Sequence, residues 1–267
     1  MSSYSHNDVI PAQRRAILLE RVRQRGAASI QELARSIGAS ASTVRRDLER
    51  LQAEGYLRRA HGGAFLPHTP LATYEPDQTF AAGLARAQKA AIGRAAAASL
   101  VAGEAVLFDS SSTVREAARA AVARRIPLTA VTNDLATGQI LAAGPEIRVI
   151  VPGGTVRPGS LTVTGEPGLG FLAGVHVETA LIGVHAISGG LFTETALETV
   201  AMKRAMIAAA RRVVVLADAT KFQPAAFCTI CDAARVHELI TDAAADPALL
   251  AQLRDLGVAV TLAADIP

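Results

Sequence analysis

The fold of the N-terminal part is decided by residues 29–65, which read SIQELARSIGASASTVRRDLERLQAEGYLRRAHGGAF. The stretch opens with Ser29-Ile30-Gln31-Glu32, a capping box in which the Ser oxygen caps the Glu amide and the Glu side chain reaches back. Gly38 predicts the end of this first short helix, because glycine adopts the left-handed conformation at little cost. Ser40 then predicts the N-cap of another helix. These signals predict two short helices joined by a tight turn.

The second of these helices is predicted to have one apolar and one polar face. Val44, Leu48 and Leu51 recur at i, i+4 and i+7, so they face the core. The opposite face offers hydroxyl and guanidinium groups, which can meet phosphates and base edges in the major groove of DNA. Arg45 and Arg46 point about 100° apart, so one can reach a base while the other holds the backbone. The DNA-facing candidates on this helix and at its cap are Ser40, Ser42, Thr43, Arg45, Arg46 and Arg50.

The segments on either side complete a recognisable order of elements. A preceding helix is predicted from Pro11 to about Gly26, with Ile17, Leu18 and Val22 on one face. After residue 55 the sequence predicts a short β-hairpin with Gly62-Gly63 as its turn. Its polar side chains are placed to touch the sugar-phosphate backbone or the minor groove. These side chains are Arg58, Arg59 and His61. The whole order predicts a winged helix-turn-helix.

The chain is predicted to form two domains. Residues 1–66 are the winged helix-turn-helix, residues 67–85 a proline-containing linker, and residues 86–267 a larger α/β domain. The first 67 residues hold eleven Arg, no Lys and six acidic residues, an excess of five positive charges, whereas the other 200 carry a net charge of −2. This excess suits a partner rich in phosphate. A small, surface-rich segment also tends to carry more charge, so charge alone leaves both interpretations open.

The C-terminal part alternates apolar runs with alanine-rich helical segments, which predicts a largely parallel sheet. In such sheets ligands bind beyond the carboxyl ends of the strands, so the loops after the strands become the candidate site. The predicted strands are Ala105–Phe108, Leu128–Val131, Val149–Val151, Ala180–Val184, Val213–Ala217, Glu238–Thr241 and Val258–Leu262.

The loop after the first strand is the main candidate for anion binding. It carries four hydroxyls and several free amides before a helix predicted to start near Val114, although an ordinary N-cap loop also contains such residues. The chain has only three Lys against 24 Arg, so a Lys retained after a strand end is a candidate phosphate ligand. Gly153 and Gly154 let the backbone approach a ligand or form a tight turn, with equal support for each. The predicted effector-binding residues are Asp109, Ser110, Ser111, Ser112, Thr113, Thr132, Asn133, Gly153, Gly154, Lys203, Asp218 and Lys221.

These residues resemble the DeoR family of bacterial transcriptional regulators. The run from Ser40 to Leu48, with Leu51 and His61-Gly62-Gly63-Ala64, is similar to the N-terminal signature of that family. The similarity continues through Asp109–Thr113, Val131–Asn133, Gly153-Gly154, Gly165, Lys203, Asp218, Lys221-Phe222 and Thr241-Asp242, and so covers essentially the whole chain.

The resemblance implies a sensor domain related to ribose-5-phosphate isomerase and a homo-oligomer, either a dimer or a tetramer. It also implies that Ser42, Thr43, Arg45 and Arg46 lie at the DNA, whereas Asp47 orients a neighbouring Arg. One position departs from the family pattern, since Ser111 stands where the phosphate loop normally has Gly. A side chain there could fill space beside the phosphate or forbid a positive φ angle.

We therefore expect a repressor of a sugar or carbohydrate catabolic operon, bound to double-stranded operator DNA and released by a phosphorylated sugar. The alternative from another class is a sugar-phosphate isomerase-like enzyme with an accessory DNA-binding segment. Its acid–base candidates would be Asp109, Asp218, Glu198 and Lys203, but no pair of them has a spacing that demands catalysis. A third possibility is a regulator without a ligand, its pocket disabled at Ser111.

We expect no catalytic residue, no cofactor and no metal site. Cys228 and Cys231 form a lone C-x-x-C without a second pair of ligands, so buried thiols are the better interpretation. The first ten residues lack the pattern of a signal peptide, and no apolar run reaches the length of a membrane span. We therefore expect a cytosolic protein with no membrane partner.

Overall fold

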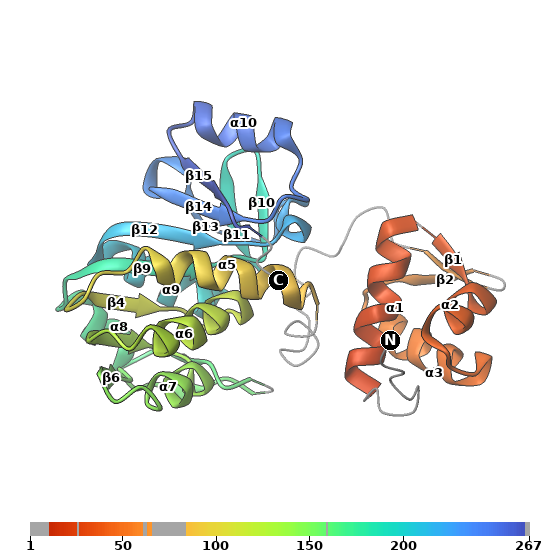
Figure 1. Ribbon diagram of the computed structural model, residues 1–267, viewed down its shortest axis with the longest axis horizontal. Helices are drawn as coiled ribbons and strands as arrows, with labels where there is room; N and C mark the ends of the chain where they lie inside the picture. The colour runs from red at the N-terminus through yellow and green to blue at the C-terminus, as the bar shows by residue number, and fades with distance from the viewer. Residues whose placement is uncertain (1–10, 26, 61–62, 66–83, 159, 265–267) are drawn as a thin grey trace. The chain divides into compact units, whose positions relative to one another are not determined.

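The computed structural model describes residues 11–264 apart from residues 26, 61–62, 66–83 and 159. The chain divides into two compact units, Met1–Leu84 and Ala85–Pro267. Figure 1 shows a small unit of helices with a short sheet and a larger α/β unit. None of the helices in these described ranges is long and apolar enough to cross a membrane.

The first unit is a helical core closed by a small antiparallel sheet. The capping box at Ser29 is present, and Gly38 ends the helix that it starts with a φ of 64°. Ser40 caps the following helix by accepting a hydrogen bond from the amide of Thr43 at 3.1 Å. The strands are joined in the order β1-β3-β2. The elements are α1 (Pro11–Arg25), β1 (Ala27–Ser29), α2 (Ile30–Ile37), α3 (Ala41–Ala53), β2 (Arg58–Ala60) and β3 (Gly63–Phe65).

Two details of this unit differ from the sequence-based expectations. Ile17 is 41% exposed, and Leu19 is fully buried beside Leu18 and Val22 instead, so the buried face of α1 is shifted from the predicted one by about one residue, roughly 100° around the helix. Gly63 does not lie in the hairpin turn but opens β3 and pairs with Ala60. Residues 61–62, which include the predicted Gly62 of the turn, lie outside the described residues.

The reason for a glycine at position 63 is the unpredicted strand β1. Gly63 pairs with Ser29, and a Cβ atom at Gly63 would lie 2.5 Å from the carbonyl oxygen of Ala28. No real Cβ tolerates this distance, so only glycine lets the two strands meet.

The second unit is built on a seven-stranded sheet with the order β15-β14-β12-β9-β4-β5-β6. Every neighbouring pair is parallel, as the alternating pattern predicts. Each of the seven predicted strands is present, with bounds that shift by up to three residues. They are β4 (Ala105–Phe108), β5 (Leu128–Thr132), β6 (Ile147–Ile150), β9 (Val177–Gly183), β12 (Ala210–Leu216), β14 (Glu238–Thr241) and β15 (Ala259–Leu262).

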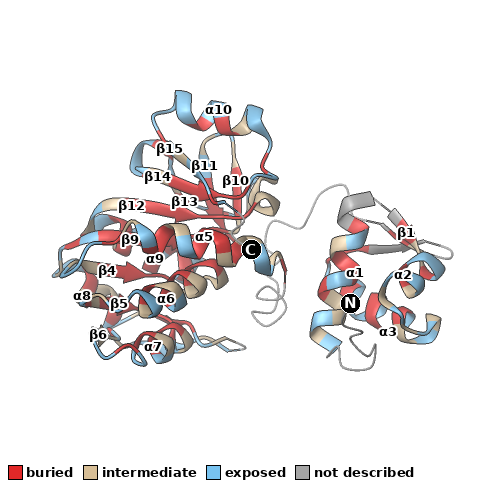
Figure 2. Cartoon of the chain, in the orientation of Figure 1, coloured by how far each residue is buried: buried red, intermediate tan, exposed pale blue. Residues whose placement is uncertain are grey.

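Helices cover both faces of this sheet and create two apolar cores. Alternate residues of β12 show the division, since Val213 and Val215 belong to one core and Val214 and Leu216 to the other. The central strands β4, β5 and β9 are consequently mostly buried in Figure 2, whereas the edge strand β15 is largely exposed. On one side pack α5 (Arg86–Ala98), α6 (Ser112–Arg124) and α7 (Leu135–Leu141), and on the other α8 (Gly168–Ala173), α9 (Leu197–Ala209) and α10 (Pro247–Asp255).

Short strands that the sequence analysis did not predict extend this unit. One small antiparallel sheet has the order β10-β11-β13, and the hairpin β7–β8 follows the edge strand β6. A single 3-10 turn, η1 (Ala219–Lys221), follows β12. The bounds are β7 (Thr155–Val156), β8 (Val163–Thr164), β10 (Ala186–Ser188), β11 (Leu191–Glu194) and β13 (Cys228–Asp232).

The strand order reverses at the centre of the large sheet. From β4 the chain adds β5 and β6 toward one edge, and from β9 it adds β12, β14 and β15 toward the other. In open parallel sheets the loops diverge at such a reversal and leave a crevice at the carboxyl ends of the two strands. The loops after β4 and β9 are therefore the expected position of a ligand site.

Helices α5 and α6 pack against each other with their backbones in contact. A Cβ atom at Gly93 of α5 would lie 2.6 Å from the amide nitrogen of Ala117 in α6. This contact is between backbone atoms, which cannot swing aside as a flexible side chain can.

We expect Gly93→Ala to lower the free energy of unfolding by about 1–3 kcal/mol, because the added methyl group must push α5 away from α6. Gly138→Ala is the matched control, since Gly138 is also a buried helical glycine but its Cβ would have its nearest neighbours at 3.5 Å. Alanine there should be neutral or stabilising through helix propensity. Urea unfolding followed by circular dichroism compares the two, and an equal change in both variants would refute the proposed close packing.

Candidate functional site

Helix α3 presents the two faces that the sequence predicts. Val44, Leu48 and Leu51 are completely buried, whereas Arg45 and Arg46 are exposed. The polar face thus offers two guanidinium groups on consecutive residues of an exposed helix surface. Such a surface has the donors needed to meet phosphates and guanine edges in a major groove.

The hydroxyl groups at the start of α3 are held in one cluster. The Ser40 oxygen lies 2.8 Å from the hydroxyl of Ser42 and 2.8 Å from that of Thr43. Arg50, one helical turn after Arg46, forms an ion pair with Glu54 and leaves its side chain largely exposed. These residues occupy one end and one side of the same helix.

Asp47 anchors α3 to α1. Its carboxylate accepts hydrogen bonds from Arg14 at 2.6 Å (Nε) and 3.3 Å (Nη2), and its side chain is buried. Asp47 therefore orients an arginine, but that arginine belongs to α1 and is not its neighbour in the sequence. The pair fixes the angle between two helices of the unit.

The predicted wing is only partly described. Arg58 and Arg59 lie in β2, while their side chains and the whole of His61 are outside the described residues. Their suggested role at the DNA backbone stays a prediction.

In the second unit, Asp109 follows β4 at the point where the strand order reverses, and its side chain joins β4 to β9. One carboxylate oxygen accepts the amide of Gly183 at the end of β9 at 2.8 Å, and the other accepts the amide of Ser111 at 2.5 Å. The same carboxylate lies 3.4 Å from Nζ of Lys203 in α9. Asp109 and Lys203, which the sequence analysis proposed separately, are therefore brought together.

Lys203 is a fully enclosed cation with three acceptors. Besides Asp109, it donates to the carbonyl of Gly183 at 2.7 Å and to the carboxylate of Glu194 in β11 at 2.6 Å. Burial opposes the charged form, but the two carboxylates raise the pKa of Lys203 well above its usual range. Burial alone would raise the pKa of Glu194, but the positive charge of Lys203 and the hydrogen bond from Lys203 lower it. Burial dominates at Asp109 and raises its pKa. The central ion pair is thus Lys203–Glu194.

Ser111 fits the loop without strain. Its φ of −85° is an ordinary extended value, and its hydroxyl caps α6 by accepting the amide of Val114 at 3.1 Å. Its side chain lies over Gly183, where a Cβ atom would be only 2.1 Å from the Ser111 hydroxyl oxygen. The departure from the family pattern is therefore accommodated by a glycine on the neighbouring strand, and no positive φ is needed.

The start of α6 offers a place for an anion. The helix begins at Ser112, two residues earlier than predicted, so the amides of Ser112 and Thr113 occupy its first turn and have no acceptor within the helix. The hydroxyls of Ser110 and Ser112 are partly accessible, whereas Thr113 is buried. Free amides and the positive end of the helix dipole favour a phosphate or carboxylate here.

Buried acceptors without partners gather at the same edge of the sheet. Among the described residues, the orphaned atoms at this edge are Oδ1 of Asn133, Oδ1 of Asp134, Oδ2 of Asp218 and Oγ1 of Thr241, each following or ending a parallel strand. A buried polar atom without a partner is unfavourable by about 1–3 kcal/mol. Several acceptors at one edge therefore indicate a ligand that brings hydroxyl or amine donors.

Asp218 lies after β12 as predicted and is held in its charged form. Burial would raise its pKa, but Lys221, Lys89 and the hydrogen bonds from Thr220 lower it. One oxygen of Asp218 accepts the amide and the hydroxyl of Thr220, at 3.0 and 2.5 Å, and the other is the unpartnered acceptor. A charged acceptor of this kind suits a sugar hydroxyl.

The loop after β5 is used mainly for structure. Thr132 accepts the amide of Asp134 at 3.1 Å, and Asn133 donates to the carbonyl of Val163 at 3.1 Å. Arg115 of α6 reaches across to Asp134 at 2.9 Å and so joins the loops after β4 and β5. Only the orphaned oxygens of Asn133 and Asp134 remain for a ligand.

Gly153 and Gly154 form a tight turn, which is one of the two roles that the sequence left open for them. Both have positive φ angles, 84° and 132°, and a Cβ atom at Gly154 would lie 2.5 Å from the carbonyl oxygen of Thr164. These glycines allow β7 to double back against β8. Their role as ligand contacts stays a prediction.

Sequence reasoning missed four residues of this region: Lys89, Arg115, Asp134 and Glu194. Glu194 gave no signal, because it ends a four-residue strand that was itself not predicted. Arg115 could have been noticed, since a basic residue four positions into a helix that begins at an anion site lies one turn from that site.

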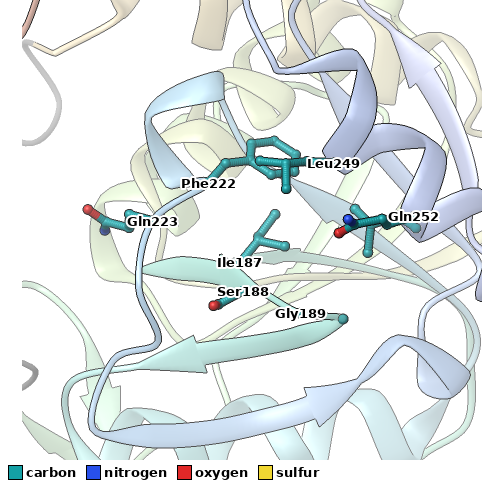
Figure 3. Close-up of a pocket in the computed structure, with 9 residues that line it drawn as sticks. Ile187, Ser188, Gly189, Phe222, Gln223, Leu249 and Gln252 are labelled. Atoms are coloured by element: carbon teal, nitrogen blue, oxygen red, sulfur yellow. The ribbon is translucent and has the colours of Figure 1, made fainter.

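A separate pocket of about 200 Å³ lies between the β10–β11 hairpin, the segment after η1, and α10 (Figure 3). Ile187 and Phe222 form apolar walls, and Gln223 and Gln252 supply amide groups. No charged side chain lines it, so it lacks a counter-charge for a phosphorylated ligand. We therefore place the candidate effector site at the carboxyl ends of the parallel strands.

Cys228 and Cys231 are free thiols of the sensor unit, Cys228 being buried. The described residues contain no group of three or more potential metal ligands of the His, Cys, Asp and Glu types. Burial raises the pKa of Cys231 to about 11. The Cys231 thiol is therefore a poor nucleophile at neutral pH.

Comparison with known proteins identifies both units. Residues 14–69 match the DeoR-like helix-turn-helix domain, and residues 85–243 match the DeoR C terminal sensor domain. The chain belongs to the DeoR family. Within that family, the basic helix α3 lies in the DNA-binding match and the crevice between β4 and β9 in the sensor match.

Curated relatives of this DeoR-family protein extend over nearly its whole length. The HTH-type transcriptional repressor CsqR of Escherichia coli is 32% identical, with 92% of this chain and 93% of the relative covered. The glycerol-3-phosphate regulon repressor of the same organism is 30% identical, with 91% and 95% covered. These relatives are regulators, and this chain is accordingly a DNA-binding transcriptional regulator and not an enzyme.

Solved structures are more distant. Ribose 5-phosphate isomerase A from Methanocaldococcus jannaschii is 15% identical with a TM-score of 0.38, covering 50% of this chain and 53% of that one. The δ subunit of eIF2B from Chaetomium thermophilum is also 15% identical, with a TM-score of 0.39 and coverage of 80% and 65%. At these scores the comparison adds nothing to the fold described above.

We expect Gly183→Ala to destabilise the sensor unit, because its methyl group would collide with Ser111. Ser111→Gly in the same protein should restore most of the loss, since it removes the colliding side chain, whereas Ser111→Gly alone should cost only a few tenths of a kcal/mol at the cap. Thermal unfolding of the four proteins measures this coupling. Additive effects would show that Ser111 does not pack on Gly183.

Proposed function

We propose that this regulator represses a carbohydrate operon and leaves its operator when a phosphorylated sugar binds the crevice between β4 and β9. The observation that carries the proposal is the set of unpartnered buried acceptors beside the free amides at the start of α6. Together they complement a molecule with a phosphate at one end and hydroxyls along the rest. The name of one relative, the glycerol-3-phosphate regulon repressor, supports a phosphorylated effector.

The DNA contact is assigned to α3 and the hairpin β2–β3. In this proposal α3 enters the major groove, the hydroxyls at its start and Arg50 hold phosphates, and Arg45 or Arg46 reaches a base. The hairpin adds backbone contacts as a wing. The proposed DNA-binding residues are Ser40, Ser42, Thr43, Arg45, Arg46, Arg50, Arg58, Arg59 and His61.

The spacing of the strands sets the length of effector that can reach both ends of the proposed site. The carboxyl ends of β4 and β12 are two strand spacings apart, about 10 Å. A phosphate bound by Ser110, Ser112 and Thr113 at α6 would therefore leave room for a chain of several hydroxylated carbons before Asp218 and Lys221 are reached. A sugar phosphate of pentose or hexose size has this length.

Release requires that the sugar phosphate binds more tightly to the conformation with weaker DNA affinity. A coupling of about 5–150-fold is ordinary for such systems. We also propose a homo-oligomer, because winged helix-turn-helix regulators gain affinity by reading two half-sites with two copies. In this scheme residues 1–66 read DNA, 67–85 connect, and 86–267 sense the effector.

We expect Arg45→Ala and Arg46→Ala each to weaken binding to DNA from upstream of the regulator's own gene by about 5-fold or more, since a base or phosphate contact is typically worth 1–3 kcal/mol. Arg119→Ala, which removes an exposed arginine of the sensor unit, should leave the affinity unchanged. Fluorescence anisotropy of labelled DNA at fixed salt gives the affinities. Wild-type affinity in both α3 variants would refute α3 as the recognition helix.

We expect one sugar phosphate from a panel to weaken the same DNA complex by about 5–150-fold, whereas the corresponding free sugar has no effect. The panel would contain glycerol 3-phosphate, ribose 5-phosphate, fructose 6-phosphate and glucosamine 6-phosphate. Because the chain has no Trp, binding to the free protein is followed by calorimetry. If none of the four binds and none releases DNA, the proposed effector class is wrong.

A further inference from the structure

The ion pair between Arg115 and Asp134 lies beside the proposed phosphate site. Arg115 is in the first turn of α6, three residues after Ser112, and residues three apart are neighbours on the surface of a helix. Asp134 follows β5 and caps α7, which packs beside α6 (Figure 1). The pair thus joins the loops after β4 and β5, which are adjacent strands of the sheet.

The two side chains are joined by a single hydrogen bond. Nη2 of Arg115 donates to Oδ2 of Asp134 at 2.9 Å, and the same oxygen accepts the amide and the hydroxyl of Thr137 at 3.2 and 2.6 Å. Three donors therefore converge on Oδ2. Among the described residues, neither Oδ1 of Asp134 nor Nε of Arg115 has a partner, although both atoms are buried.

Another Arg–Asp pair of this chain shows the complete form of the contact. In the DNA-binding unit, Nε of Arg14 donates to Oδ2 of Asp47 at 2.6 Å, and Nη2 donates to Oδ1 at 3.3 Å. Both carboxylate oxygens are used there, as is usual when a guanidinium group meets a carboxylate. At Arg115 and Asp134 one half of the contact is open, and leaving buried polar atoms open is unfavourable.

The open half is complementary to a hydroxyl group. Nε of an arginine can only donate a hydrogen bond, and a carboxylate oxygen accepts one. A hydroxyl can accept from Nε and donate to Oδ1 at the same time. An oxygen of a second carboxylate would satisfy Nε of Arg115 but would face the negative charge of Asp134, and an apolar carbon would satisfy neither atom.

We propose that Arg115 and Asp134 form a hydroxyl-selective subsite, which binds a hydroxyl group near the phosphate of the effector. The effector is then a phosphorylated sugar or polyol with a free hydroxyl toward its phosphate end. Phosphorylated acids that carry a carboxylate at this position are rejected. The inference rests on the proposed function, since it needs a phosphate at the start of α6.

Asp134→Asn tests the subsite because its two effects on binding have opposite signs. Asparagine has the shape of aspartate and is an equally good N-cap. Its carbonyl oxygen is expected at the position of Oδ2, where three donors point, so its NH₂ group replaces Oδ1. The loss of a negative charge would by itself strengthen the binding of a phosphate. The exchange of an acceptor for a donor weakens the binding of the hydroxyl group.

Calorimetry with the full-length protein measures binding of the four panel phosphates and, by competition, of methyl phosphate, which has no hydroxyl-bearing carbon. We expect Asp134→Asn to bind the panel member that wild type binds about 5-fold or more weakly, because a buried donor is left without a partner. It should bind methyl phosphate at least as tightly as wild type does. Asp246→Asn is the matched control, since it removes a carboxylate from the N-cap of α10 and should bind both ligands as wild type does.

Arg115→Lys gives a second test if Asp134→Asn does not fold. Lysine keeps the positive charge opposite Asp134 but lacks the forked pair of donors, so this variant should also bind the panel member about 5-fold or more weakly and keep its affinity for methyl phosphate.

Unchanged or tighter binding of the panel member by Asp134→Asn would overturn the inference, and the open half would then hold only an ordered water. Equal weakening of the panel member and of methyl phosphate would also overturn it, because Asp134 would then act only by holding the loops in place. Both results leave the proposed function standing. Wild-type protein that binds none of the four panel phosphates would refute the proposed function and this inference together.

Discussion

The structure of the sensor unit depends on neutralising one buried ammonium group. Lys203 lies between the ends of β4, β9 and β11, and it contacts Asp109, the carbonyl of Gly183 and Glu194. A buried charge that loses one partner typically destabilises a protein by 3–5 kcal/mol. Three segments far apart in the sequence are therefore fixed to one point, and this point lies where the strand order reverses. The loops at this reversal are thus held together by an ion-pair network.

This arrangement decides which groups are left for a ligand. Lys203 and Glu194 are bound to each other, and the two oxygens of Asp109 accept the backbone amides of Ser111, before α6, and Gly183, in β9. The groups left for a ligand are amide donors at the start of α6 and unpartnered acceptors at the ends of β5, β12 and β14. Of Asp109, Glu194 and Asp218, it is Asp218 that keeps one oxygen without a partner among the described residues, whereas Asp109 and Glu194 are held by Lys203 and by backbone amides. Such an oxygen can accept a hydrogen bond from a hydroxyl of a bound ligand.

The predictable part of the fold is the part with strong periodic signals. The seven parallel strands are rich in apolar residues, so each was found, and the caps at Ser29 and Ser40 fixed two helices. The strands β1, β7, β8, β10, β11 and β13 have two to five residues each and contain polar residues, so they form no apolar run that the sequence could show. Gly63 was assigned to a turn because its true cause, the carbonyl of Ala28, belongs to one of these strands. Glu194 was missed for the same reason, since its function comes from Lys203, nine residues later in the chain.

Lysine and arginine occupy different places in this chain. The chain uses 24 Arg and only three Lys, and all three Lys act on the two aspartates of the crevice, Lys203 on Asp109 and both Lys89 and Lys221 on Asp218. Arginine presents its donors in a flat fork, whereas an ammonium group directs three donors in different directions. Lys203 needs the second geometry because its three acceptors come from three separate elements. In this chain, which supplies most of its positive charge with arginine, the three lysines thus lie where a compact cation neutralises a carboxylate of the sensor unit.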